Sequence, residues 1–468
     1  MPQEDRPNIL LIVMDTARAD HLSCYGHPHP TTPVLDQLAE EGTRFATAIS
    51  PAEWTVPSHA SLFTGTFPSR HSAVNQHRYL DGRLHTLAEV LGRLGYRTAC
   101  FTNNAFISEA TGLNRGFRLT DGPFRWNGSR RPTHLFWRGM RKLTQWTGRK
   151  DQGAMFTNLL VYRWLLRRWD GEHPFFLFIN YVEPHMPHRW IPEPFRRRFL
   201  QLNGLEGADW RSVNMNYRAF LTGTAPMGEE DFAILRALYE AEMAYLDHRI
   251  GQLVAFLRRR GILDNTLLII TSDHGDNLGE HGLMHHAYAL YETLIHVPLI
   301  IRYPPAFPAG MVVEQIVQTH DLFPTILHLA GVDEPTVWDQ VQGFSLLPDH
   351  LSAHPDYAVA ELMRPINEFA ERYPDFDFSP FDRELRAYRT RRYKYIWASD
   401  GRDELYDLVQ DPGETDNLIH KRPDVAADLR QRLLAWMEAH PIEASTVTEV
   451  PEYDEAVLAR LRDLGYVE

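Results

Sequence analysis

An apolar run of strand length that ends in a dense polar cluster constrains this chain more than any other feature. The segment Leu267–His286 reads LLIITSDHGDNLGEHGLMHH, and Asp273 and His274 come directly after its apolar part. In an open α/β sheet, ligands bind at the carboxyl ends of strands, where loops present side chains without disturbing the core. A carboxylate beside an imidazole at such a place predicts a divalent-cation site. A solvated polar surface loop is the alternative.

A second apolar run near the start of the chain ends in the same way. Asn8–Met14 is followed by Asp15, and its continuous apolar pattern predicts a central strand covered on both faces. Further buried strands are predicted at Tyr96–Thr102 and Pro174–Asn180. Two aspartates from separate strand ends, Asp15 and Asp273, can meet at one metal ion.

Several segments, taken in order, resemble the sulfatase family of the alkaline phosphatase superfamily. They are NILLIVMDTARAD near the start, PSHASLFTG at Pro57–Gly65, YVEPHMPH at Tyr181–His188, TSDHGDNLGEHG in the polar cluster, and RTRRYKYIW and LYDLVQDPGETDNL near the end. The resemblance spans nearly the whole chain. It implies an α/β fold, with a large mixed sheet between helices and a smaller C-terminal α+β subdomain.

The resemblance carries a metal-binding role to Asp15, Thr55, Asp273 and His274. Oxygen-rich ligation with one imidazole fits a single Mn²⁺, Mg²⁺, Ca²⁺ or Zn²⁺ ion, and the sequence does not choose among them. Many sulfatases have a second aspartate after the first, whereas Thr16 stands here. In this respect DTARAD resembles the phosphonate monoester hydrolases, which use one fewer carboxylate.

The nucleophile position departs from the sulfatase pattern. WTVPSHASLFTG matches the family's C-x-P-x-R signature, with Thr55 at the cysteine and His59 at the arginine. In sulfatases that cysteine becomes formylglycine, whose hydrated aldehyde attacks the ester, and a threonine cannot become an aldehyde. A hydroxyl activated by a metal and nearby positive charge can still attack, so Thr55 is predicted to be the nucleophile. Capping of a helix that begins near Pro57 is the alternative.

Other side chains are predicted to contact the substrate. The resemblance places His59, His185 and His286 around the anionic group and its leaving oxygen, and a structural role is the alternative for His286. Candidate donors to substrate oxygens, or alternatively turn-forming amides, are Asn75, Gln76, Asn103 and Asn104. The family's GKWH-like element is missing here. Pro187 stands four residues after Glu183, where a second metal ion would require a histidine.

The chain is expected to divide into a catalytic domain, residues 1–350, and a C-terminal subdomain, residues 351–468, with a small antiparallel sheet. A long helix is predicted over Glu229–Arg260, directly before the central strand. The arginine- and tryptophan-rich segment 125–150 is interpreted as a helix with a packed aromatic face. A rim that contacts the substrate is the alternative for this segment.

Composition restricts the partners and the cellular context. The formal net charge of -13 argues against nucleic acid as a partner, because phosphate binding needs a basic field. The chain has only two cysteines, Cys24 and Cys100, too few for a disulfide framework. Neither a signal segment nor a membrane-spanning run is recognised, so a cytoplasmic location without membrane contact is expected. The sequence does not indicate the oligomeric state.

These features predict a metal-dependent, sulfatase-like hydrolase of small anionic esters. Threonine at the nucleophile position favours phosphodiester or phosphonate monoester hydrolysis. Three alternatives stay open: sulfuric ester hydrolysis, phosphotransfer to an acceptor other than water, and a catalytically silent metal-binding partner protein. The alcohol portion of the substrate is not indicated by the sequence.

Overall fold

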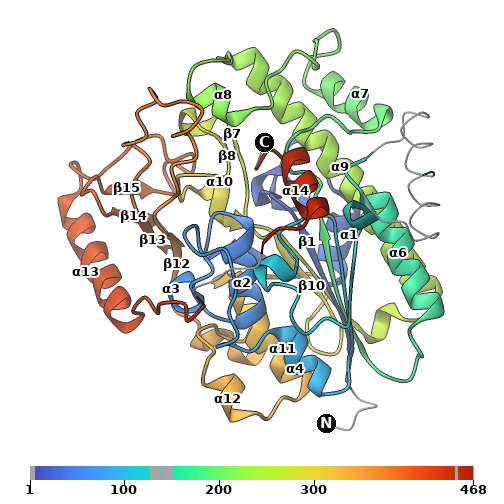
Figure 1. The fold of residues 1–468 in the computed structure, drawn as a ribbon. Coiled ribbons are helices and arrows are strands. Elements are labelled where there is room, and N and C mark those ends of the chain that lie inside the picture. Colours follow the sequence, from blue (N-terminus) through green and yellow to red (C-terminus); the bar gives the residue numbers. More distant parts are fainter. Residues whose placement is uncertain (1–5, 127–138, 140–150, 448–451, 467–468) are drawn as a thin grey trace.

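The computed structural model describes residues 6–126, 139, 151–447 and 452–466, and within them the largest element is a nine-stranded mixed sheet (Figure 1). The strand order is β11-β2-β10-β6-β1-β5-β3-β4, and β9 pairs with β2. The strands are β1 (Asn8–Met14), β2 (Thr43–Ile49), β3 (Arg97–Thr102), β4 (Leu119–Asp121), β5 (Phe175–Tyr181), β6 (Thr266–Thr271), β9 (His296–Val297), β10 (Leu299–Arg302) and β11 (Met311–Gln318). The predicted fold class is confirmed. Most of the segment 125–150 lies outside the described residues.

The centre of this sheet is parallel and buried on both faces. β1 pairs in parallel with β5 and with β6, whereas β10 runs antiparallel to β6. Every residue of β1, β5 and β6 is buried, as their continuous apolar sequences predict. Because β1 and β6 are parallel neighbours, Asp15 and Asp273 leave the sheet at the same edge.

Helices cover both faces of the sheet. On one face α2 (Thr55–Thr64), α4 (Leu87–Arg93) and α11 (Leu322–Ala330) share a core with Leu11 and Phe178. On the other, α1 (Pro33–Glu41), α6 (Ala154–Arg167) and α9 (Glu229–Arg259) share a core with Leu10 and Ile179. The predicted long helix is therefore present as α9. Among the described helices, none has both the length and the apolar composition needed to cross a bilayer.

Short elements complete the large unit. They are α3 (Pro68–His71), α7 (Glu193–Leu202), α8 (Tyr217–Leu221), α10 (Glu292–Ile295), α12 (Pro335–Trp338), β7 (Asn277–Leu278) and β8 (Met284–His285). β7 and β8 pair antiparallel within the predicted polar cluster. This pairing folds the cluster back over the edge of the sheet, so that its histidines return toward Asp273.

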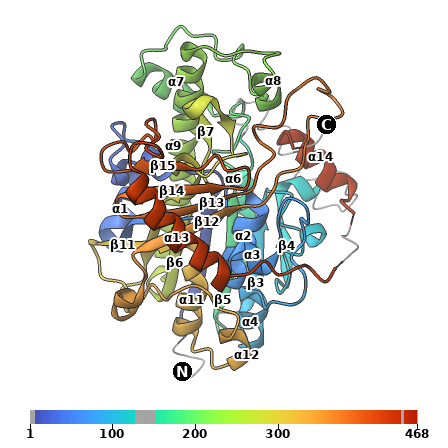
Figure 2. The same cartoon turned by 90° about the vertical axis from the view of Figure 1, so that its left-hand side faces the viewer.

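The C-terminal part of the chain forms a second, antiparallel sheet of order β12-β13-β14-β15. Its elements are β12 (Tyr357–Leu362), β13 (Leu385–Thr390), β14 (Tyr393–Ala398), β15 (Glu404–Asp407) and the helix α13 (Pro423–Ala439). Figure 2 shows α13 lying across this sheet. The small antiparallel sheet is present as predicted, and the domain boundary at residue 350 stays a prediction.

The last described helix, α14 (Glu455–Asp463), returns from the small sheet to the large unit. Val457 and Leu461 are buried in the core that α2 and α4 share. In Figure 1, α14 lies near the carboxyl ends of the parallel strands. The residues after α14 thereby reach the edge of the sheet where Asp15 and Asp273 lie.

Candidate active site

The four predicted metal ligands meet at the carboxyl ends of β1 and β6. A carboxylate oxygen of Asp15, one of Asp273 and a ring nitrogen of His274 lie within 4.8 Å of one another. The Thr55 hydroxyl oxygen is 3.4 Å from His274 Nε2. None of the four side chains belongs to a residue more than 4% exposed. The structure thus brings together residues from three separate parts of the sequence.

Two carboxylate oxygens in this group, Asp15 Oδ1 and Asp273 Oδ2, have no hydrogen-bond partner among the described residues. Their other oxygens accept hydrogen bonds, from Asn104 Nδ2 at 2.6 Å and from the His274 backbone N–H at 3.0 Å. Burial, reinforced by the nearby Asp273, raises the pKa of Asp15 to about 8, and burial raises that of Asp273 to about 7. An unpartnered buried carboxylate is costly. The set therefore fits a divalent cation, which would stabilise both acids.

The His274 ring is oriented to present Nε2 to this site. Its Nδ1 lies 2.9 Å from the Gly275 carbonyl oxygen, which assigns the ring proton to Nδ1. Burial lowers the His274 pKa and so favours the neutral, metal-binding ring. Gly275 is needed here because a Cβ atom would lie 2.0 Å from the Thr293 carbonyl oxygen. The close approach explains why glycine follows Asp273-His274.

Thr55 is the first residue of α2, so the helix begins two residues earlier than Pro57. Trp54 occupies the capping position, and no side-chain capping bond is formed there. The Thr55 hydroxyl instead lies 3.4 Å from both His274 Nε2 and Asn104 Nδ2. A helix N-terminus favours negative charge nearby. The position of Thr55 therefore fits attack on an anionic ester better than it fits the alternative role, capping of the helix.

His59 lies one turn further along α2 than Thr55. Its Nδ1 is 2.8 Å from the Thr55 carbonyl oxygen and 3.5 Å from Asp273 Oδ2. The ring packs edge-on against Phe63 and Phe178. Burial lowers the His59 pKa to about 3, so the ring is neutral. These contacts favour support of Thr55 and Asp273, and the predicted contact of His59 with the substrate stays a prediction.

His185 and His286 are joined by a residue that the sequence did not reveal, Tyr466. Its hydroxyl lies 2.9 Å from His185 Nε2 and 2.8 Å from His286 Nε2. Ring nitrogens of His185, His285 and His286 also lie within 4.8 Å of one another. The His286 and His274 ring centroids are 4.4 Å apart, so this second group adjoins the first. Tyr466 lies near the end of the chain, far from every motif, and no sequence signal marked it.

The four predicted amide donors form two groups according to their hydrogen-bond partners. Asn104 lies inside the cluster, beside Asp15 and Thr55. The other three donate to backbone carbonyls: Asn75 to Met363, Gln76 to Arg364 and Asn103 to Gln152. Substrate contact by these amides stays a prediction.

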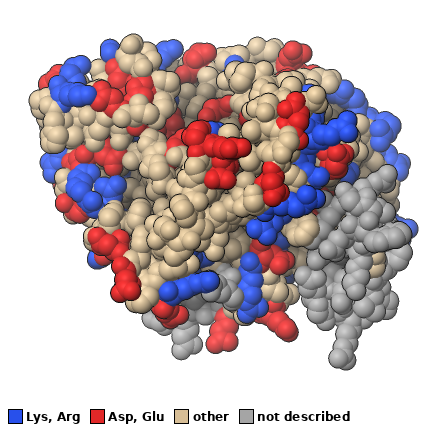
Figure 3. All heavy atoms as spheres, turned by 90° about the horizontal axis from the view of Figure 1, so that it is seen from above, with Lys and Arg blue, Asp and Glu red and all other residues tan. Residues whose placement is uncertain are grey.

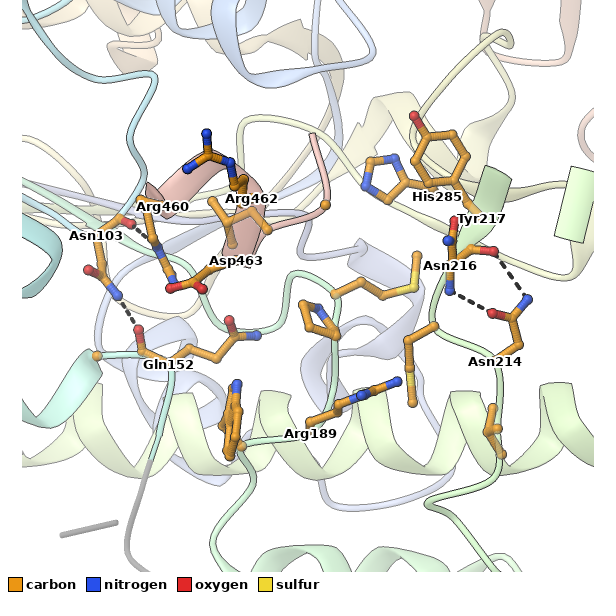
Figure 4. Close-up of a pocket in the computed structure, with 18 of the residues that line it drawn as sticks. Asn103, Gln152, Arg189, Asn214, Asn216, Tyr217, His285, Arg460, Arg462 and Asp463 are labelled. Atoms are coloured by element: carbon orange, nitrogen blue, oxygen red, sulfur yellow. Dashed lines mark hydrogen bonds and ion pairs between the residues drawn. The ribbon is translucent and has the colours of Figure 1, made fainter. Parts of the chain in front are cut away.

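A cavity of about 760 Å³ adjoins the second histidine group (Figure 4). His285 forms part of its wall and stacks on Tyr217, with 4.5 Å between the ring centroids. Its arginines are Arg189, Arg211, Arg218, Arg460 and Arg462, and Asp463 is also in the lining. On the outer face shown in Figure 3, acidic and basic side chains are interspersed. The cavity lining thus contains five arginines and two aspartates, Asp151 and Asp463.

The fold and the cluster define an α/β protein with a candidate metal centre at the carboxyl edge of its sheet. Residues 7–332 match the sulfatase family, and residues 279–439 match the C-terminal domain of N-sulphoglucosamine sulphohydrolase. The chain therefore belongs to the sulfatase family. The predicted family and the predicted hydrolysis of an anionic ester are confirmed at this level, and members of the family use a divalent metal.

Individual relatives carry two kinds of name. The chain is 26% identical to arylsulfatase K of Bos taurus, over 94% of this chain and 83% of that protein. It is 27% identical to an arylsulfatase of Clostridium perfringens, over 89% of this chain and 90% of that protein. A solved structure, the phosphonate monoester hydrolase of Agrobacterium radiobacter, has a TM-score of 0.73 and 25% identity, over 96% of this chain and 98% of that one. The family likeness alone does not choose between sulfur and phosphorus.

Proposed function

We propose that this protein hydrolyses phosphodiesters or phosphonate monoesters with Thr55 as the nucleophile. The observation that carries the proposal is the Thr55 hydroxyl at the N-terminus of α2, 3.4 Å from His274 Nε2. A threonine cannot supply the hydrated aldehyde on which formylglycine sulfatases depend. The likeness to a solved phosphonate monoester hydrolase supports the same conclusion.

The residues around Thr55 can divide the chemistry among them. A divalent cation held by Asp15, Asp273, His274 and Thr55 would supply positive charge that lowers the hydroxyl pKa and offsets the charge of the ester. Asn104 bonds to Asp15 and faces the Thr55 hydroxyl, so it positions both. His185 and His286 adjoin this group, and their neutral Nε2 atoms are placed to accept the Thr55 proton and pass it to the leaving oxygen.

The way in which the covalent ester is cleared favours phosphorus. In a first step, Thr55 gives its hydroxyl proton to the neutral Nε2 of His185 or His286, and the bond from Thr55 Oγ1 to phosphorus forms as the bond to the leaving oxygen breaks. The imidazolium passes that proton to the leaving oxygen. A formylglycine ester then releases its group by breaking its own C–O bond, whereas a threonine ester has no second hydroxyl for that route. Water must therefore attack phosphorus and break the bond to Thr55 Oγ1, with His185 or His286 accepting a proton from the water and returning it to the Thr55 oxygen. Fixed donors around the transferred group serve in-line displacement of this kind.

Sulfate ester hydrolysis is a second candidate, because the curated relatives are arylsulfatases. Matched aryl esters of one phenol separate the two: a phosphodiester, a phosphonate, a phosphate monoester and a sulfate, each tested with Mn²⁺, Mg²⁺, Ca²⁺ and Zn²⁺. We expect the highest kcat/KM for the phosphodiester or the phosphonate. A wild-type protein that cleaves the sulfate fastest would overturn the proposal. Products formed only with an added alcohol would indicate phosphotransfer.

A further inference from the structure

The hydroxyl of Tyr466 lies among the groups that the proposed function assigns to the ester. It contacts Nε2 of His185 at 2.9 Å and Nε2 of His286 at 2.8 Å. The Tyr466 ring packs edge-on against Phe106, with 4.8 Å between the centroids. A residue from the far end of the chain thus completes a site otherwise built at the sheet edge.

We infer that Tyr466 is a catalytic residue whose hydroxyl donates a hydrogen bond to an oxygen of the anionic group of the ester. This inference rests on the proposed function for the place of the ester, and on the hydrogen bonds of the two histidines. His185 Nδ1 lies 2.5 Å from the Met186 carbonyl oxygen, and His286 Nδ1 lies 3.3 Å from Asp276 Oδ1. In neutral rings both Nδ1 atoms therefore carry the proton, and both Nε2 atoms are acceptors.

One phenol proton cannot satisfy two acceptors. Tyr466 can donate to His185 or to His286, so at any moment one of the two contacts has no proton. A bound ester offers a charged oxygen instead, and hydrogen bonds to an ionised acceptor are about twice as strong as neutral ones. The ester therefore draws the Tyr466 proton to itself.

The segment that carries Tyr466 is held in place by several contacts. α14 is anchored by the buried Val457 and Leu461. Arg218 donates to the backbone carbonyl oxygens of Gly465, at 2.5 Å, and of Tyr466, at 3.2 Å. The same guanidinium group also forms an ion pair with Glu368 at 2.5 Å. A donor that is positioned before the reaction stabilises a transition-state anion best.

The test compares Tyr466→Phe with Tyr453→Phe. Tyr466→Phe removes the hydroxyl and keeps the ring. Tyr453 is a matched control, because its ring also contacts Phe106, with 6.4 Å between the centroids, while the charged group that acts on its hydroxyl is Arg78. We expect Tyr466→Phe to lower kcat on the order of 100-fold, the loss typical of one oxyanion donor. The inhibition constants of inorganic phosphate and of sulfate should rise in Tyr466→Phe and stay unchanged in the control.

Two controls keep the outcome clear. The metal content and thermal midpoint of Tyr466→Phe should match those of the wild type, because the variant retains the packing against Phe106. A chain truncated after Leu464 should show the same loss of kcat. Equal activity in Tyr466→Phe and the wild type would overturn the inference, and so would higher activity, which would show that Tyr466 blocks the site. The comparison uses whichever ester the wild type hydrolyses. If no ester is hydrolysed, the binding of phosphate and sulfate is compared by calorimetry. Failure of the phosphoryl preference therefore leaves this test intact.

Discussion

Replacing Asp273 by asparagine should stabilise the metal-free protein while it removes the metal. Burial raises the pKa of Asp273 from 3.8 to about 7, and Oδ2 has no hydrogen-bond partner among the described residues. Above pH 7 the metal-free fold must therefore hold a buried, poorly partnered carboxylate. A difference of about 3 between the folded and unfolded pKa values corresponds to at most on the order of 4 kcal/mol.

The direction of this pH dependence follows from the linkage between protonation and folding. Because the folded pKa of Asp273 exceeds its unfolded value, this group costs nothing below pH 3.8, costs more as the pH rises to about 7, and costs a constant amount above it. An asparagine avoids that cost and keeps the local hydrogen bonds. Its oxygen can accept the His274 backbone N–H, and its amide can donate to His274 Nε2, now 3.4 Å from Oδ2. We expect the variant to be more stable than the wild type at pH 8 by roughly 1 to 4 kcal/mol.

Urea unfolding in the presence of EDTA, followed by circular dichroism at pH 5 and pH 8, measures this difference. The gain in Asp273→Asn should be smaller at pH 5. Asp81→Asn is a control of opposite sign, because burial raises the Asp81 pKa less than the hydrogen bonds from Arg83, Thr446 and Ser445 together lower it. A metal-free Asp273→Asn that is less stable than the wild type at pH 8 would refute this reasoning.

Three further predictions concern the metal and the histidines. Asp15→Ala should lose bound metal and activity but keep its circular dichroism spectrum, since apolar burial holds the sheet; stoichiometric metal in this variant would contradict the assignment. His185→Ala and His286→Ala should lower kcat by roughly 10²- to 10⁴-fold and retain about one equivalent of metal; loss of metal would assign that histidine to an ion. Metal affinity should weaken as the pH falls below about 8, because the metal displaces protons from Asp15 and Asp273, whose pKa values are about 8 and 7. Calorimetry in buffers of different ionisation enthalpy would reveal those protons, and identical heats would rule them out.

The sheet and the cluster of Asp15, Asp273 and His274 could be predicted because their signals are local. Asn8–Met14 is a continuous apolar run with an acid after it, and the structure reproduces it as β1. The parallel pairing of β1 and β6 then brings Asp15 and Asp273 together. Thr16, by contrast, has a φ of 60°, which a β-branched residue rarely adopts and no sequence pattern predicted.

The rest of the site depends on contacts between distant segments. No local sequence pattern indicates that α14 lies near the parallel strand ends or that Tyr466 reaches His185. In the same way, the amides of Asn75 and Gln76 could not be separated from substrate donors by sequence alone. Both bond to backbone carbonyls of a segment almost 300 residues further along the chain. Such long-range partners follow from the tertiary fold.

The covalent intermediate on Thr55 tests the central claim most directly. Wild type, Thr55→Ser and Thr55→Ala are incubated with a slow aryl phosphonate, quenched in acid and mapped by peptide mass spectrometry. The account predicts that the wild-type peptide containing Thr55 gains the mass of the phosphonyl group, that the serine variant shows the same adduct, and that the alanine variant shows none. A wild type that turns over the ester with an adduct on another residue, or whose Thr55→Ala variant keeps full activity, would contradict it.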